Sequence, residues 1–256
     1  MPPKFYKHLG PITYKDLSEI IEIENYSKDH DHFEFNSFCG NDYSCNNDLT
    51  FISNKKDIDL SSFSARGILC SGNINFKLFD EKIIIIKVQD LHNSIAKISN
   101  KFYREFNLLE INKQKKSIIG ETDNKSNNSI IQNGCIIGKN LQIEDGAVVK
   151  NNCLIGENVF IGANSVIQNT IIGDDVKIES NCSIGQPGFG FAFNKNQNNK
   201  IFHIGRVIIQ NNTHIGSNCT IDRGSFSDTQ IGENVYLDNL VHVAHNVCIG
   251  SNCIIA

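Results

Sequence analysis

The strongest pattern in the chain is an aliphatic residue that returns every six positions through its second half. The spacing is unbroken from Ile131 to Ile167, and it resumes after a slip of one residue. The recurring positions are Ile131, Ile137, Ile143, Val149, Ile155, Ile161, Ile167, Ile172, Ile178, Ile184, Ile209, Ile215, Ile221, Ile231, Leu237, Val243, Ile249 and Ile255. This repeat predicts a parallel β-helix of hexapeptide repeats, and the spacing alone leaves its handedness open.

Each hexad of such a helix supplies a short strand and a turn. The aliphatic residue points into a narrow core, so the residue four positions later has to be small. Gly or Asn at the corners accepts left-handed backbone angles that other residues resist. A single coil cannot bury its own apolar face, so stability comes from the stacking of coils.

The same frame explains most of the cysteines. Five of the nine occupy the small position of a hexad, namely Cys135, Cys153, Cys182, Cys219 and Cys253. A buried, inert thiol fits there, whereas a metal cluster needs sulfurs that converge. Without an export signal, nine cysteines also indicate reduced thiols and a cytoplasmic protein.

The first half of the chain has no sixfold pattern and reads as a small α/β domain. Helical spacing predicts helices within 12–23 and 91–106, and apolar runs predict strands at 49–53, 67–70 and 82–88. The polar stretch 107–128 reads as a linker. We therefore predict an α/β domain over 1–106, a linker over 107–128 and a β-helix over 129–256.

One long interruption of the repeat, residues 186–206, contains serial phenylalanines. Loops that leave rigid solenoids commonly carry function, so we interpret it as a lid or a subunit contact.

Composition excludes several function classes. The formal charge is -4, which gives no basic field for nucleic acid. The longest purely apolar run, Ile83 to Ile86, is too short to span a bilayer. The N-terminus lacks the apolar core of a signal peptide.

Two histidines near the end, His242 and His245, lie three residues apart and raise three possibilities: metal ligands, a catalytic base, or passengers in the repeat. Zinc would need a third ligand, which His203 or His214 would have to supply. Nothing around the pair provides one in sequence, so we expect no metal.

The motifs GFGFAF, IGRVII, IGSNCTIDRG, IGENVYLDN and HVAHNVCIG together resemble the UDP-3-O-(3-hydroxyacyl)glucosamine N-acyltransferases of lipid A biosynthesis. The resemblance covers residues 129–256. It extends more thinly to Asn47–Asn54, which is similar to the family's uridine-binding segment. It implies a left-handed β-helix that forms a homotrimer, with active sites between subunits.

The resemblance also implies a reaction. An (R)-3-hydroxyacyl group moves from the phosphopantetheine of acyl carrier protein to the 2-amino group of a UDP-3-O-acyl-glucosamine. No further cofactor is implied. An imidazole can take the proton of the attacking nitrogen at neutral pH, and the thioester is already activated. We expect the oxyanion donor in a later coil.

Residue roles follow from matching the family's motifs. His245 in the AHN motif is the implied base, and the residues that would support it are Asp238, Asn239 and His242. The implied substrate-binding residues are Phe51, Asn54 and Asn246. Because a net negative chain needs a concentrated basic patch to bind an acidic carrier protein, we predict that Arg206 and Arg223 contribute one.

The chain departs from the family at several points, which leaves alternatives open. His242 is a departure toward the sister UDP-N-acetylglucosamine O-acyltransferase, which also has two histidines three apart. Asp57 replaces an expected aromatic residue in the uridine segment. The chain also ends in mid-hexad at Ala256, where the family continues, so a catalytically weak or inactive remnant is a further expectation.

Overall fold

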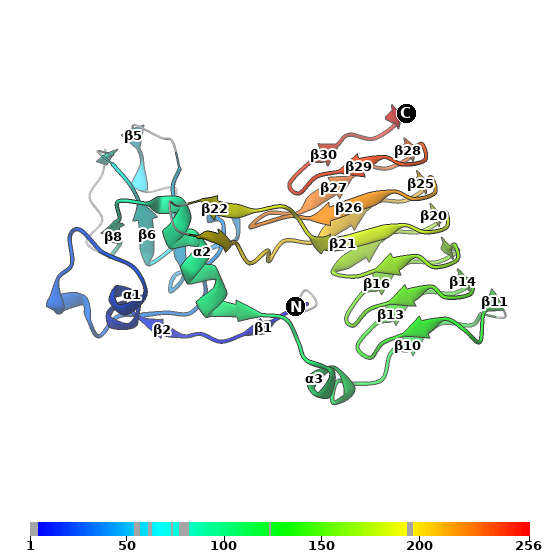
Figure 1. The fold of residues 1–256 in the computed structure, drawn as a ribbon, viewed down its shortest axis with the longest axis horizontal. Coiled ribbons are helices and arrows are strands. Elements are labelled where there is room, and N and C mark those ends of the chain that lie inside the picture. The colour runs from blue at the N-terminus through cyan, green and yellow to red at the C-terminus, as the bar shows by residue number, and fades with distance from the viewer. Residues whose placement is uncertain are drawn as a thin grey trace. The chain divides into compact units, whose positions relative to one another are not determined.

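The computed structural model describes residues 5–53, 57–60, 63–72, 74–76, 82–122, 124–193 and 197–256. Its contacts divide the chain into two units. The α/β unit comprises residues 7–104 and 190–202, and the solenoid unit comprises residues 1–6, 105–189 and 203–256. In Figure 1 the colour runs from blue at the N-terminus to red at the C-terminus, so the segments of each unit can be identified by residue number.

The α/β unit is built on a parallel sheet of three strands, in the order β4 (Leu49–Phe51), β6 (Gly67–Cys70) and β8 (Ile84–Lys87). The helices α1 (Tyr14–Ile20) and α2 (Leu91–Phe102) complete its main elements. These confirm the predicted strands and helices. Its shorter elements are β1 (Lys7–His8), β2 (Ile12–Thr13), β3 (Glu34–Phe35), β5 (Asp57–Ile58), β7 (Asn75–Phe76), β9 (Tyr103–Arg104), and the 3-10 turns η1 (Lys28–His30) and η2 (Asn41–Tyr43).

Both helices begin at capped positions. The Thr13 side chain accepts a hydrogen bond from the Asp16 amide, and the Asp16 carboxylate accepts one from the Thr13 amide, so that α1 has a capping box. The Asp90 side chain accepts from the Asn93 amide at the start of α2. Residues at helical spacing then bury one face of α2, including Leu91, Ile95 and Phe102.

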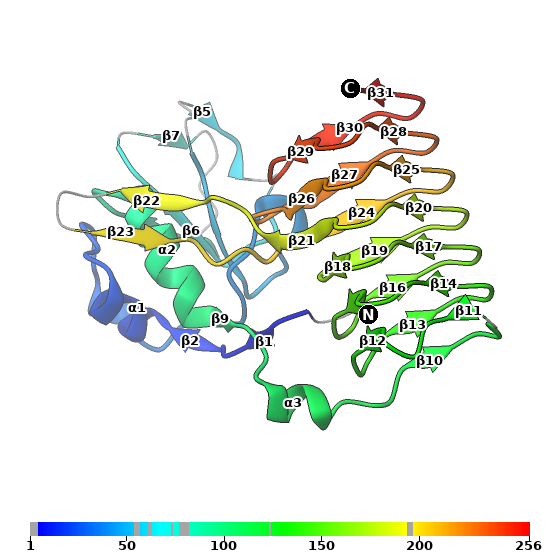
Figure 2. The ribbon, with the colours of Figure 1, turned by 45° about the vertical axis from the view of Figure 1, so that its right-hand side comes forward.

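The solenoid unit consists of stacked coils whose strands form three parallel sheets, which Figure 2 shows from the side. The first sheet contains β10 (Ile118–Ile119), β13 (Ile136–Ile137), β16 (Leu154–Ile155), β19 (Thr170–Ile172), β24 (Val207–Ile209), β27 (Thr229–Ile231) and β30 (Cys248–Ile249). The second contains β11 (Asn124–Lys125), β14 (Gln142–Ile143), β17 (Phe160–Ile161), β20 (Lys177–Ile178), β25 (His214–Ile215), β28 (Tyr236–Leu237) and β31 (Ile254–Ile255). The third contains β12 (Ile130–Ile131), β15 (Val148–Val149), β18 (Val166–Ile167), β21 (Ser183–Pro187), β26 (Thr220–Arg223) and β29 (His242–Val243). This architecture confirms the predicted parallel β-helix, preceded in the sequence by a small α/β region.

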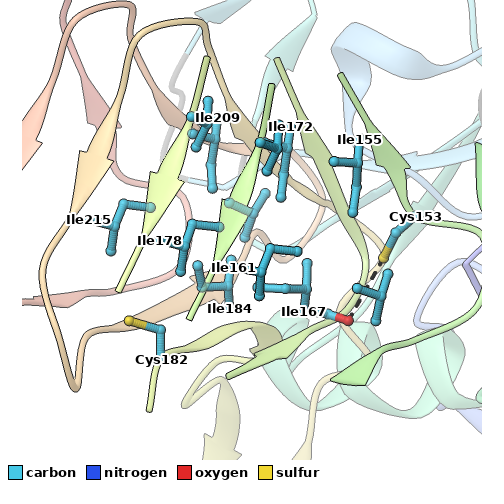
Figure 3. Packing of buried hydrophobic residues seen from close by; sticks show 14 of the residues in the cluster. Cys153, Ile155, Ile161, Ile167, Ile172, Ile178, Cys182, Ile184, Ile209 and Ile215 are labelled. Atoms are coloured by element: carbon cyan, nitrogen blue, oxygen red, sulfur yellow. Dashed lines mark hydrogen bonds between the residues drawn. The ribbon is translucent and has the colours of Figure 1, made fainter. Parts of the chain in front are cut away.

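The repeat aliphatics form the core of the solenoid. Ile155, Ile172 and Ile209 of the first sheet stack along the axis, as Figure 3 shows, and the other two sheets contribute equivalent columns. Four of the five cysteines in the small position are buried as predicted, and Cys253 in the last coil is half-buried. Burial raises the pKa of the Cys153 thiol to about 12 and that of Cys182 to about 11. The thiols are therefore neutral and unreactive at physiological pH.

Asparagines turn most of the corners. The non-glycine residues with positive φ are Asn140, Asn152, Asn158, Asn164, Asn169, Asp175, Asn181, Asn212, Asn218, Asn234, Leu240, Asn246 and Asn252. Asparagine tolerates this region better than other residues with a side chain, because its short amide makes local hydrogen bonds. The predicted role of Asn at the corners is confirmed.

The segment 107–128 is not the linker that we predicted. It contains α3 (Leu108–Asn112), and β10 and β11 pair with β13 and β14 of the following coil. Its polar composition misled the prediction because the strands of this first coil are exposed. The solenoid therefore begins before residue 129.

The long interruption, which we interpreted as a lid or a subunit contact, is hydrogen-bonded to α2 of the α/β unit. Its strands β22 (Phe191–Phe193) and β23 (Asn198–Lys200) form an antiparallel hairpin. Asn100 Nδ2 donates to the Lys200 carbonyl at 2.6 Å, and the Phe202 amide donates to Ser99 Oγ at 3.1 Å. Both partners lie on α2, so the hairpin has a structural role in that unit.

Two of the sheets carry aliphatic residues on their outer faces. The aliphatic outer positions of the first sheet are Ile118, Ile136, Leu154, Ile171 and Ile208, and those of the third are Ile130, Val148 and Val166. In the later coils these faces carry Gln230 and Cys248, and Ser183, Thr220 and His242. Ile118, Ile130 and Ile136 are each more than half exposed. The outer face of the second sheet is mixed. Asn124, Gln142, Lys177 and His214 lie there together with Phe160, Tyr236 and Ile254.

Adjacent residues of β14 provide a test of the core. We expect Ile143→Ala to lower the free energy of unfolding by about 2–5 kcal/mol, because Ile143 is 2% exposed and its removal leaves a cavity. The exposed Gln142→Ala should change it by less than about 0.5 kcal/mol. Chemical denaturation measures both, and equal effects would contradict the inward assignment of the repeat aliphatic.

Candidate functional site

His245 occupies the turn between β29 and β30, at the corner that follows the third sheet. Its side chain packs against the chain at Gly188. A Cβ atom at Gly188 would come within 2.8 Å of both Cβ and Cδ2 of His245. Glycine is therefore required there for the imidazole to hold its position. The GFGF cluster contains the glycine, but the sequence did not reveal this contact.

Asn246 fixes the orientation of this imidazole. Asn246 Oδ1 accepts a hydrogen bond from the Ser225 amide at 3.1 Å, and Asn246 Nδ2 donates to the Ser227 carbonyl at 3.1 Å. Because an amide N–H only donates and a carbonyl only accepts, the two ends of the side chain cannot be exchanged. His245 Nδ1 lies 2.7 Å from the same Asn246 Oδ1.

The consequence is a defined tautomer. An oxygen that only accepts requires a proton on His245 Nδ1, so in the neutral ring Nε2 carries the free lone pair. Ser225 Oγ, 3.3 Å from Nδ1, lies beside the same contact. The corner therefore presents a nitrogen base whose other nitrogen is held by hydrogen bonding. Ser225 was missed because it belongs to a break in the repeat that carried no recognisable motif.

A buried imidazole, that of His203, lies against the half-buried ring of His245. His203 is 2% exposed, and its ring centroid is 5.2 Å from that of His245 in an edge-on arrangement. This contact further restricts rotation of the His245 ring. In sequence His203 figured only as a candidate zinc ligand.

Asp238 and Asn239 lie at a different corner, between β28 and β29. Asn239 Oδ1 accepts from the Ser217 amide at 2.7 Å, and Asp238 Oδ1 accepts from the Asn239 amide at 2.7 Å. Among the residues that the structure describes, neither shares a hydrogen bond with His245. The sequence separation of seven places them one corner earlier on the coil, so within this chain they do not support the base.

His242 projects from the outer face of β29 and belongs to a separate polar network. Its Nδ1 lies 2.7 Å from Thr220 Oγ1, and its Nε2 lies 3.9 Å from Asp222 Oδ2. The Asp222 carboxylate is nearly buried and accepts a hydrogen bond from Gln186 Nε2 at 2.7 Å. His242 thus lies beside a carboxylate while its side chain stays largely exposed. Asp222 and Gln186 were not predicted.

In the part of the chain that the structure describes, no three His, Cys, Asp or Glu side chains converge as metal ligands. His214 lies on the second sheet instead, where its Nε2 is 3.0 Å from Glu179 Oε1.

The uridine-type segment is only partly visible. Phe51 is half-buried in β4, with its ring centroid 5.6 Å from that of the buried Phe38. Asn54 lies outside the described residues, and Asp57 begins β5. Near the start of the segment, Asn47 and Ser44 line a polar hollow of about 430 Å³.

The predicted basic patch is wrong. Arg223 is fully buried, and its Nε donates to the Gly205 carbonyl at 2.6 Å. Burial lowers the pKa of this guanidinium to about 10. Arg206 is paired through two nitrogens with the Asp228 carboxylate, at 2.6 Å and 3.1 Å. Arg223 ends β26 inside the solenoid, and Arg206, directly before β24, is held by Asp228. Neither residue therefore offers an unpaired surface charge.

Family models match two parts of the solenoid. The model described as the GMPPB C-terminal domain matches residues 113–190, and the bacterial transferase hexapeptide model (six repeats) matches residues 228–256. These matches confirm the hexapeptide repeat. Within the described residues, no helix combines the length and apolar character needed to cross a membrane.

Curated relatives match a shorter stretch. The UDP-3-O-acylglucosamine N-acyltransferase of Bradyrhizobium sp. (strain ORS 278) is 51% identical over 90 residues, which are 35% of this chain and 25% of the relative. The enzyme of the same name from Rickettsia typhi is 58% identical over 85 residues, 33% of this chain and 25% of the relative. Over this stretch the chain is homologous to these acyltransferases, as the motifs predicted, and it spans about a quarter of their length.

Among solved structures, the chain is similar to AntD, an N-acyltransferase from Bacillus cereus in complex with dTDP and 3-hydroxybutyryl-CoA. The identity is 18%, the TM-score is 0.43, and the match covers 59% of this chain and 84% of that one.

The tautomer of His245 can be measured directly. We expect nitrogen-15 NMR at a pH where the ring is neutral to find the proton on Nδ1, because Asn246 Oδ1 holds it there. Asn246→Ala should allow the Nε2–H form to appear. Asn140→Ala, at another corner residue with positive φ, is the matched control and should leave the His245 signals unchanged. A neutral wild-type ring protonated on Nε2 would contradict the assignment.

Proposed function

We propose that this chain supplies the catalytic solenoid of an N-acyltransferase. It transfers an (R)-3-hydroxyacyl group from the phosphopantetheine thioester of acyl carrier protein to the 2-amino group of a UDP-3-O-acyl-glucosamine, in lipid A biosynthesis. The observation that carries the proposal is the His245–Asn246 pair, a base of defined tautomer at a corner of the solenoid. Homology to enzymes of that name supports the choice of substrates.

In this proposal His245 Nε2 removes a proton from the sugar amine as its nitrogen attacks the thioester carbonyl carbon. The C–N bond forms and gives a tetrahedral oxyanion, while the imidazolium keeps its Nδ1–H bond to Asn246. The oxyanion then collapses and the C–S bond breaks. The departing thiolate takes the proton from Nε2, which restores the neutral base.

We propose that the α/β unit contacts the nucleotide of the acceptor. Phe51, Asn54 and the polar hollow beside Asn47 are the candidate nucleotide contacts. Carrier-bound phosphopantetheine is part of the donor, and no other cofactor is proposed. We also place the protein in the cytoplasm, because its nine cysteines are unpaired.

A second candidate function is O-acylation of UDP-N-acetylglucosamine. It is favoured by one observation, the presence of His242 three residues before His245 and 3.9 Å from the Asp222 carboxylate. The two reactions differ in the acceptor atom, since one needs a free 2-amino group and the other a 3-hydroxyl.

Acyl transfer from 3-hydroxyacyl carrier protein to each acceptor tests the reaction and the base together. We expect turnover with the free amine, and a loss of about 10²–10⁴-fold for His245→Ala, the usual contribution of a positioned general base. His214→Ala, a surface histidine on the second sheet, is the control and should retain activity. Unchanged turnover by His245→Ala would show that His245 is not the general base. Preference for the hydroxyl acceptor would favour O-acylation of UDP-N-acetylglucosamine.

We further propose that the chain acts as a homotrimer in which the outer aliphatic face of the first sheet is covered by a second copy. Exposed isoleucines at Ile118 and Ile136 support this, because a contiguous apolar surface is unfavourable in water.

Light scattering coupled to size-exclusion chromatography tests the trimer. We expect a mass of three chains for the wild type and smaller species for Ile136→Lys, which places a charge in the apolar face. Gln142→Lys, on the outer face of the second sheet, should remain trimeric. A monomeric wild type, or dissociation by the control substitution alone, would refute this arrangement.

A further inference from the structure

A cavity of about 420 Å³ lies in the solenoid unit, and His245 is not among the residues that line it. It follows the corner at which β12, β15 and β18 end. Gln132, Lys150 and Gln168 each come directly after the last residue of one of these strands, so they stack one coil above another. The reaction proposed above uses none of these residues.

The polar wall of the cavity is rich in hydrogen-bond donors. Lys150 Nζ donates to Gln168 Oε1 at 2.9 Å, which is a neutral partner. In the described part of the chain no carboxylate forms an ion pair with Lys150. Asn151 Nδ2 is buried at the cavity and donates to no described residue. A buried donor without an acceptor is costly, so the wall favours a ligand that accepts hydrogen bonds.

The charge around the cavity is positive on balance. Glu105 is the carboxylate on its wall, but Glu105 Oε1 lies 3.9 Å from Nη1 of the buried Arg223. The Arg223 charge therefore offsets that of Glu105. Lys150 remains as the cation without a counter-charge, and this favours an anion.

The opposite wall is apolar. Its side chains come from the start of the described chain and from the region of α3, and they are Phe5, Phe106, Leu108 and Ile111. Leu108 is 69% exposed, and it marks the side from which solvent and ligands have access. A headgroup that accepts hydrogen bonds at one wall and a hydrocarbon at the other would satisfy both surfaces.

From these features we infer that the cavity is a second binding site, which takes a carboxylate with a short alkyl chain. The carboxylate lies at Lys150 and Asn151, and the alkyl chain lies along Phe5, Phe106 and Leu108. His245 does not line this site, and the inference does not depend on the acyl transfer proposed above.

Calorimetric titration of the full chain with octanoate tests this inference without any measurement of activity. We expect saturable binding of octanoate. Acetate lacks the alkyl chain and octan-1-ol lacks the charge, so each should bind at least about tenfold more weakly, since a charge-assisted contact or a buried chain is worth that much.

Two pairs of variants locate the site. Lys150→Met should weaken octanoate binding about tenfold, whereas Lys139→Met, at an exposed lysine outside the cavity, should not. Leu108→Glu adds a negative charge at the accessible side and should also weaken binding. Leu109→Glu changes the next residue of α3, which is 72% exposed and does not line the cavity, and should have no effect.

Several outcomes would overturn the inference. Absence of octanoate binding would show that the cavity is not a binding site for it. Equal binding of octan-1-ol would show that the site does not recognise the carboxylate. Wild-type affinity in both Lys150→Met and Leu108→Glu would place the ligand elsewhere. Leu108 is exposed, so Leu108→Glu keeps the test valid if Lys150→Met proves unstable in thermal unfolding.

Discussion

The fold depends on one constraint, the alignment of inward aliphatic residues from each coil to the next. A strand of two residues has room for one inward side chain, and this side chain must contact its equivalent in the coils above and below. Ile155, Ile172 and Ile209 satisfy this along one sheet even though the chain between them slips by one residue and later leaves the solenoid. Because nearest-neighbour stacking supplies the stability, irregular segments are tolerated wherever the column itself is kept.

The candidate functional residues lie at corners because the aliphatic columns fill the interior of the solenoid. Inner positions are apolar and outer positions lie on flat sheet faces, whereas a corner brings together turns from successive coils. His245, Ser225 and Gly188 meet at such a place although they belong to three different turns. The cavity beside Lys150 follows the corner below the third sheet for the same reason.

The aliphatic columns could be predicted from the sequence, whereas the contacts at the corners could not. Hexad spacing assigned the buried column, the buried cysteines and the asparagine corners, since each depends on local position within six residues. Contacts between coils could not be assigned, because Ser225 and His245 are separated by 20 residues whose path includes a break in the repeat. The prediction of a basic patch was wrong for a similar reason. A sequence shows that Arg223 carries a charge, but its burial depends on Gly205 and Glu105, which come from distant segments. Polar composition likewise concealed the first coil within 107–128.

The hydrogen bonds of Asn246 give this residue two tasks that cannot be separated. The same side chain that holds Nδ1 of the imidazole also ties Ser225 and Ser227 to the turn. A substitution would therefore alter the chemistry of the corner and loosen the neighbouring loop at once. A variant that restores the loop through new contacts would still lack the acceptor that holds the proton on His245 Nδ1.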